Sequence, residues 1–132
     1  MSKSARGFSL AELILAAAIL AFALSGLLLL FSNCVLLNET NRNLTMATSH
    51  AKYVLEEIRH LSVADIGAQL NLGKWNWNTA AITAQGLSPL RNEAIATQSS
   101  GVNPLTLTVT VTWNDRHNRA HSTQVQTIVT DY

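Results

Sequence analysis

The chain has 132 residues, 48% of them apolar, and a formal net charge of +1. This length suits one small domain plus an anchor, and the charge leaves no basic surface of the kind that nucleic-acid binding needs. The single cysteine, Cys34, excludes an internal disulfide, and we expect it to fill space in a packed helix.

A long apolar run begins at Phe8. It extends to Phe31 over 24 residues, and Glu12 is its only charged residue. A helix of this length measures about 36 Å, enough to cross a hydrocarbon core of roughly 30 Å. The basic residues Lys3 and Arg6 precede the run, and no basic residue follows it for ten positions. The positive-inside rule therefore predicts a single pass, with the N-terminus in the cytoplasm and the remaining chain outside.

The residues at the entrance to this run form a specific pattern, Arg-Gly-Phe-Ser-Leu-Ala-Glu-Leu at positions 6–13. With the apolar helix behind it, this stretch resembles the N-terminal region of type IV pilins and type II secretion pseudopilins. In that family a membrane prepilin peptidase cuts after the glycine and methylates the new amine. The resemblance implies cleavage between Gly7 and Phe8, N-methylation of Phe8, and an assembly role for Glu12. It also implies two kinds of protein partner, other pilin or pseudopilin subunits and the prepilin peptidase/methyltransferase, together with the inner membrane.

The position of Glu12 has a physical meaning of its own. A carboxylate inside a spanning segment is expensive and by default indicates a function. Cleavage after Gly7 would create an ammonium group on Phe8 at the depth of Glu12. Pairing of Glu12 with the amine of a neighbouring subunit would relieve both buried charges and fix the register between the subunits.

Two simpler interpretations of the apolar run remain open. It is an ordinary membrane anchor with one tolerated acid, or it is a secretory signal peptide with a small-x-small cleavage site at Ala21-Phe22-Ala23. Against the signal peptide, Glu12 would fall inside its apolar region, and the run continues to Phe31.

The chain after Phe31 continues the helix as an amphipathic segment. Apolar residues recur at steps of three and four, which is one face of a helix: Leu44, Ala47, Ala51, Val54, Leu55, Ile58 and Leu61. No proline precedes residue 89. We therefore expect one helix from Phe8 to about Leu61, with a possible bend in the polar stretch 38–43. The predicted organisation is a leader at 1–7, a transmembrane and filament-core helix at 8–31, its amphipathic continuation at 32–61, and a small periplasmic domain at 62–132.

Residues 62–104 contain four glycines and two prolines, and their apolar residues show no sustained helical or strand periodicity. This composition predicts an irregular connection. Short strands are candidates at Ala80–Ala84 and at Ala94–Gln98. Trp75 and Trp77 would point the same way in an extended chain, so we expect them to form a local core. The alternative is a carbohydrate-stacking site.

The clearest strand is Leu105–Trp113, where apolar residues alternate with four threonines. Asn114-Asp115 begins a turn, and Ser122–Thr130 is a second run rich in β-formers. The two segments predict an antiparallel hairpin whose apolar face lies on the amphipathic part of the helix. The expected fold class is therefore α+β and pilin-like: a long N-terminal helix packed on a small antiparallel sheet.

The sequence contains no arrangement that indicates catalysis. His50, His60, His117 and His121 are expected to be solvated and not to hold a metal, and no nucleophile triad, phosphate loop or carboxylate pair is present. We expect no enzyme activity, no cofactor and no nucleic-acid partner. The predicted function is that of a minor pilin-like subunit of a type IV pilus, located in the bacterial inner membrane and then in the filament. The alternatives are a pseudopilin of a type II secretion system and, from another class, a membrane-anchored binding domain that does not polymerise.

Overall fold

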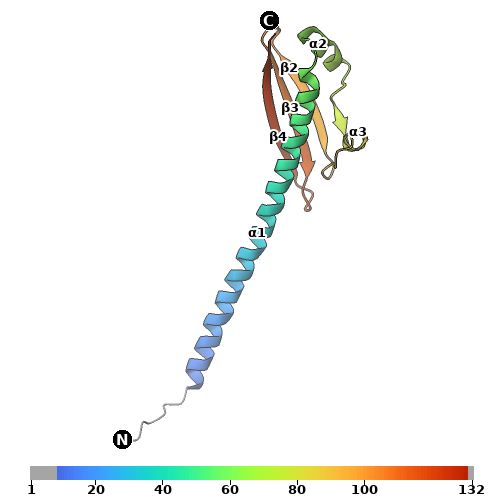
Figure 1. Ribbon diagram of the computed structural model, residues 1–132. Coiled ribbons are helices and arrows are strands. Elements are labelled where there is room, and N and C mark those ends of the chain that lie inside the picture. Colours follow the sequence, from blue (N-terminus) through green and yellow to red (C-terminus); the bar gives the residue numbers. More distant parts are fainter. Residues whose placement is uncertain (1–8, 131–132) are drawn as a thin grey trace, which may run out of the picture. The chain divides into compact units, whose positions relative to one another are not determined.

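The computed structural model describes residues 9–130. The chain divides into two compact units, residues 1–39 and 40–132. Helix α1 (Leu10–Arg59) begins in the first unit and ends in the second (Figure 1). The single long helix is thus confirmed, and no break interrupts it in the polar stretch 38–43.

In the first unit, every residue from Ser9 to Asn38 is exposed. Its large apolar side chains are about half to four-fifths exposed, from 40% at Leu36 to 82% at Phe22. Cys34 is exposed as well, so it fills no space among the described residues of this chain. An apolar surface this long has no reason to face water, and it marks a membrane or protein contact.

The second unit is a helix on a four-stranded sheet. After α1 come α2 (Val63–Asn71), β1 (Trp77–Asn78), α3 (Thr79–Ala84), β2 (Ala94–Ser100), β3 (Leu105–Asn114) and β4 (Ala120–Val129). The sheet has the order β1-β2-β3-β4, and every neighbouring pair is antiparallel. The C-terminal part of α1 lies along one face of this sheet (Figure 1). The α+β, pilin-like arrangement predicted from the sequence is confirmed.

The predicted hairpin forms with β3 and β4, paired from Leu105↔Val129 to Asn114↔Ala120. Along β3 the five apolar residues at alternate positions are buried, because their side chains share the face that meets the helix. One hydrophobic core joins them to α1. The α1 residues in this core are Ala47, Ala51, Val54, Leu55 and Ile58. Leu44, which the helical spacing also placed on this face, is 42% exposed.

The expectation of an irregular connection over residues 62–104 is wrong. Two short helices occupy it because polar side chains cap them. The Ser62 side chain accepts from the Asp65 N–H at the start of α2, and the Asn78 side chain accepts from the Ala81 N–H at the start of α3. The strand expected at Ala80–Ala84 is therefore helix α3, whereas the strand expected at Ala94–Gln98 is confirmed as part of β2.

Trp75 and Trp77 are core residues, with 1% and 6% of their surfaces exposed. The Trp77 Nε1 donates to the Lys74 carbonyl at 2.9 Å. The local-core prediction is confirmed, and burial this complete contradicts a carbohydrate-stacking role because neither ring offers an open face.

His50 is not solvated, contrary to expectation. It is 6% exposed, and its Nδ1 lies 2.7 Å from Oε1 of the fully buried side chain of Glu93. The second Glu93 oxygen accepts from the Leu90 N–H at 2.6 Å. This buried pair ties α1 to the start of β2.

Candidate assembly site at the start of helix α1

The first turn of α1 is closed by a reciprocal pair of hydrogen bonds. The Glu12 N–H donates to the Ser9 Oγ at 3.3 Å, and the Ser9 N–H donates to the Glu12 Oε2 at 3.0 Å. The Ser9 hydroxyl also donates to the same Glu12 oxygen at 3.2 Å. Ser9 and Glu12 thus form a capping box, in which two of the N–H groups that a helix start leaves unpaired find partners.

The capping box orients the Glu12 carboxylate toward the N-terminal end of the helix, where the helix dipole favours a negative charge. The sequence signal for it, Ser-x-x-Glu ahead of an apolar run, is present at positions 9–12 but formed no part of the prediction. The second carboxylate oxygen, Oε1, has no hydrogen-bond partner within residues 9–130. Within the described residues, one oxygen therefore serves the helix and the other has no partner.

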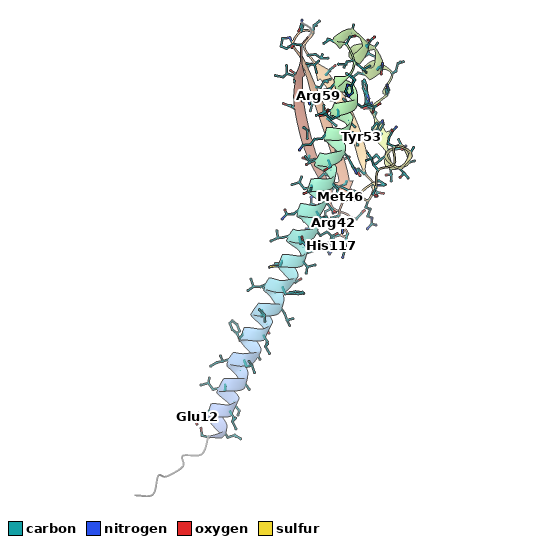
Figure 2. All side chains as sticks on the ribbon, viewed as in Figure 1. Glu12, Arg42, Met46, Tyr53, Arg59 and His117 are labelled. Atoms are coloured by element: carbon teal, nitrogen blue, oxygen red, sulfur yellow. The ribbon has the colours of Figure 1, made fainter. Side chains whose placement is uncertain are left out.

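The surroundings of Glu12 are apolar and open. Its neighbours one turn further along the helix surface, Leu15 and Ala16, are both exposed. Figure 2 shows the Glu12 side chain at the first turn of α1. This arrangement presents one carboxylate on an otherwise apolar surface, which suits pairing with a cation that approaches through an apolar medium.

The two processing residues predicted from the sequence, Gly7 and Phe8, lie outside the described residues. Of the three predicted site residues, the structure therefore places only Glu12, at the start of the helix.

Helix α1 contains a segment long and apolar enough to cross a membrane, and none of that segment is buried within the protein. The comparison with protein families finds a match that overlaps this apolar segment. Residues 2–28 match the prokaryotic N-terminal methylation motif. The chain carries the prepilin motif of type IV pilins and pseudopilins. The matched residues include the junction of Gly7 and Phe8 and also Glu12.

The motif match ends at residue 28. No curated protein and no solved structure matches the chain. The pilin-like character of the second unit therefore stands on its own geometry, a helix packed on an antiparallel sheet. Proteins with this motif and this arrangement are generally structural and not enzymes, and their apolar helix anchors them in the inner membrane before assembly.

The histidines of the β3–β4 hairpin, His117 and His121, were the remaining candidates for a site. His121 Nε2 lies 3.2 Å from Oδ2 of Asp115, and its ring stacks on Trp113 with centroids 5.8 Å apart. His117 is exposed at the tip of the β3–β4 turn. Within residues 9–130, no three His, Cys, Asp or Glu side chains gather in a way that could hold a metal ion.

Proposed function

We propose that this protein is a minor pilin-like structural and assembly subunit of a type IV pilus. It is made as a precursor inserted once in the bacterial inner membrane, with its C-terminus in the periplasm. Prepilin peptidase removes residues 1–7 and methylates the amine of Phe8, and the subunit then enters the filament. The observation that carries this proposal is a prepilin motif whose glutamate, Glu12, stands on an exposed apolar helix.

The chemistry of assembly follows from the two charges at the mature N-terminus. Processing places the ammonium of Phe8 four residues before the Glu12 carboxylate. In an apolar medium an unpaired charge costs several kcal/mol, so each charge gains most from an opposite charge on a neighbouring subunit. Because the capping box uses only Oε2, the free Oε1 can accept from that amine without loss of the helix start. The exposed apolar side chains of α1 would then pack against one another in the filament core.

A pseudopilin of a type II secretion system would use the same processing and the same pairing, and it is the alternative within this class. A membrane-anchored domain that does not polymerise is the alternative outside it. In that case Glu12 serves only to cap α1.

Two substitutions separate the roles of Glu12. Glu12→Gln removes the charge and keeps a side chain that serves in a capping box, while Ser9→Ala breaks the box and keeps the charge. We expect Glu12→Gln to be processed and inserted but to stay in the membrane fraction, with little of it in sheared filaments. We expect Ser9→Ala to enter filaments nearly as well as the parent, since loss of a cap costs only about 0.5–2 kcal/mol.

The measurement is the fraction of tagged subunit in sheared filaments and in membranes. Equal recruitment of Glu12→Gln and parent would contradict the proposed function. Equal losses from Glu12→Gln and Ser9→Ala would show that Glu12 acts through the helix start and not through a neighbour's amine.

A further inference from the structure

Strand β4 is an unpaired edge of the sheet. The strand order is β1-β2-β3-β4, so β4 pairs with β3 on one side, and no other described strand lies on its outer side (Figure 1). In an edge strand every second residue turns its backbone N–H and C=O groups away from the sheet. Along its ten residues β4 therefore presents a regular row of donors and acceptors, which we call the open edge.

The opposite edge of the same sheet is covered by the chain itself. Strand β1 pairs with Ala94 and Ile95 at the start of β2. Further along β2, the Thr97 N–H donates to the Asn76 Oδ1 at 3.0 Å, and the Thr97 hydroxyl donates to the Trp75 carbonyl at 3.1 Å. Within residues 9–130, no backbone hydrogen bond of this kind reaches β4 from outside its hairpin with β3.

The open edge lacks the features that protect edge strands from pairing. Proteins protect such strands with charged side chains, prolines or bulges. Strand β4 contains no proline and no Asp, Glu, Lys or Arg. Its ten pairs with β3 run without a bulge, from Asn114↔Ala120 to Leu105↔Val129. A straight, uncharged edge of this length is ready to accept another strand.

The turn before β4 holds the open edge in place. One Asp115 carboxylate oxygen accepts from the backbone N–H groups of His117 and Arg119, at 2.9 and 2.8 Å. The other accepts from the Arg119 Nε at 2.7 Å. Because β4 begins at Ala120, the next residue, the first part of the edge is fixed before any partner arrives.

The sheet face turned away from α1 is uncharged. On this face β3 contributes four threonines and one asparagine, and β2 and β4 contribute only Ala, Ser, Gln and Ile. These side chains neither attract nor repel a charge on a strand added at β4. Selection between partners must therefore come from the face that meets the helix.

On the helix side a shallow groove runs along β4. It has a volume of about 250 Å³ and is lined by Lys52, Leu55, Glu56 and Arg59 of α1 and by residues 125–127 of β4. Its apolar lining is Leu55 and Val125, which both belong to the hydrophobic core or pack against it. Side chains of a strand point alternately to its two faces, so a strand paired with β4 turns every second side chain toward this groove.

The charges around the groove do not balance. The Arg59 Nη1 lies 3.0 Å from the Glu56 Oε1, so these two side chains neutralise each other. Lys52 is exposed and has no hydrogen bond or ion pair among residues 9–130. An acidic side chain two residues from an apolar one, on the same face of the added strand, would meet the Lys52 ammonium. Complementary charges of this kind set the choice of partner more than the affinity.

The sheet pairing fixes the end of the groove at which Lys52 lies. His50, just before Lys52, contacts Glu93, and β2 begins at the next residue, which the pairing places level with Ser122 of β4. Helix α1 and β4 therefore run in the same direction along the groove, and Lys52 lies at the end nearer to Ser122.

From this edge and groove we infer that β4 pairs with an extended segment of a different filament subunit, one with an apolar and an acidic side chain two residues apart. Backbone hydrogen bonds supply the affinity, and the groove supplies the specificity. A second copy of this chain suits the site less well, because its β4 carries no acidic residue and its β2 edge is covered. The inference rests on the proposed function in naming a filament subunit as the source of the segment.

The test uses the full chain in detergent micelles and a synthetic peptide with the sequence of β3 and the change Val111→Glu. The β3 sequence is suited to the open edge because β3 already pairs with β4 on its other side. In the same register, the glutamate lies beside Thr123, toward the Lys52 end of the groove. A second peptide carries Val111→Lys. We expect the glutamate peptide to bind more tightly than the lysine peptide, as measured by fluorescence anisotropy.

Two N-methylated isomers of the glutamate peptide test the backbone pairing. One carries methyl groups on the threonine amides and the other on the amides of the residues between them, so each isomer has one blocked edge. We expect one isomer to bind like the unmodified peptide and the other to bind at least about tenfold more weakly, because several hydrogen bonds are lost. Hydrogen exchange should show protection in Ala120–Val129 and none in Ala94–Ser100.

A matched pair of variants tests the charge at the groove. Lys52→Glu reverses the charge of an exposed side chain, and Lys52→Arg keeps it. We expect Lys52→Glu to weaken binding of the glutamate peptide by roughly fivefold and to strengthen binding of the lysine peptide. Lys52→Arg should resemble the parent. We also expect Lys52→Glu to lower recruitment of the subunit into sheared filaments, and Lys52→Arg to leave it unchanged.

Equal binding of the two N-methylated isomers, or no protection of β4, would overturn the inference. Self-association of the chain that the peptide displaces would overturn it in favour of a second copy. Normal recruitment of Lys52→Glu into filaments would overturn the assignment of the segment to a filament subunit. Absence of peptide binding, with Glu12→Gln lost from filaments, would contradict this inference alone. Peptide binding by a chain whose Glu12→Gln variant is recruited normally would contradict the proposed function and, with it, the source of the segment.

Discussion

The carboxylates of Glu12 and Glu93 show how differently one residue type is used in this chain. Glu12 is exposed on an apolar helix and holds the helix start with one oxygen. Glu93 is fully buried and uses both oxygens, one toward His50 and one toward the Leu90 N–H. The first can meet a partner outside the chain, because its second oxygen has no partner among residues 9–130 and its side chain is exposed. Each oxygen of the Glu93 carboxylate has a partner within the protein, and its role is to fix α1 on the sheet.

The buried pair gives a prediction for stability. His50→Leu leaves the Glu93 carboxylate buried without its side-chain partner, and breaking such a pair costs about 3–5 kcal/mol. We expect the double variant His50→Leu/Glu93→Leu to be less destabilised than His50→Leu alone, because it leaves no buried carboxyl group without a side-chain partner. Urea unfolding followed by tryptophan fluorescence measures this, since Trp75, Trp77 and Trp113 all lie in the second unit. A single variant as stable as the parent would contradict a structural role for the pair.

At the scale of the elements, the β3–β4 turn depends on the charge of Asp115. The pKa of Asp115 is held well below its ordinary range, chiefly by the hydrogen bond from the Arg119 backbone N–H. Desolvation of the carboxylate opposes this lowering, and hydrogen bonds from the side chains of His121 and Arg119 reinforce it. A lowered folded-state pKa stabilises the fold above the unfolded pKa of about 3.9 and loses that effect as pH falls toward the folded value. We expect Asp115→Asn to lower the melting temperature by an amount that is constant above about pH 5 and shrinks below about pH 4. The exposed ion pair of Glu56 and Arg59 provides the control, since Glu56→Gln should have little effect throughout. A deficit that does not depend on pH would show that the Asp115 charge is not what orders the turn.

The elements also show which parts of the fold the sequence could predict. Helix α1 and strand β3 were predictable because each shows one sequence pattern over many residues. In β3, apolar residues alternate with polar ones, and α1 combines a long apolar run with an amphipathic continuation. Helices α2 and α3, nine and six residues long, were missed because their order comes from caps at Ser62 and Asn78 and not from a period. The burial of His50 could not be predicted, since its partner Glu93 is 43 residues away in the sequence. At the candidate site, the motif identified Glu12, but the capping box at Ser9 was overlooked although its signal was local.

At the scale of the whole molecule, the two units have separate parts in the function that we propose, that of a filament subunit. The first offers a helix whose large apolar side chains are exposed, and the second folds around its own core. The proposed maturation step makes assembly depend on removal of the leader, because the amine that pairs with Glu12 exists only after the leader has been cut. Assembly is then conditional on processing, and a precursor with its leader should remain in the membrane.

This condition can be tested at the cut site. A glycine before the cut lets the peptidase approach its carbonyl, because glycine has no Cβ, and a β-branched residue obstructs that approach. We expect Gly7→Val to insert normally but to retain residues 1–7, which intact-mass spectrometry would show, and to be absent from sheared filaments. Gly26→Val is the matched control, since Gly26 lies within α1 and an added Cβ there meets nothing within 4 Å. The control should lose its leader like the parent. Removal of the leader from Gly7→Val would place the cut elsewhere, and filaments built from the uncut variant would show that Glu12 does not need the Phe8 amine.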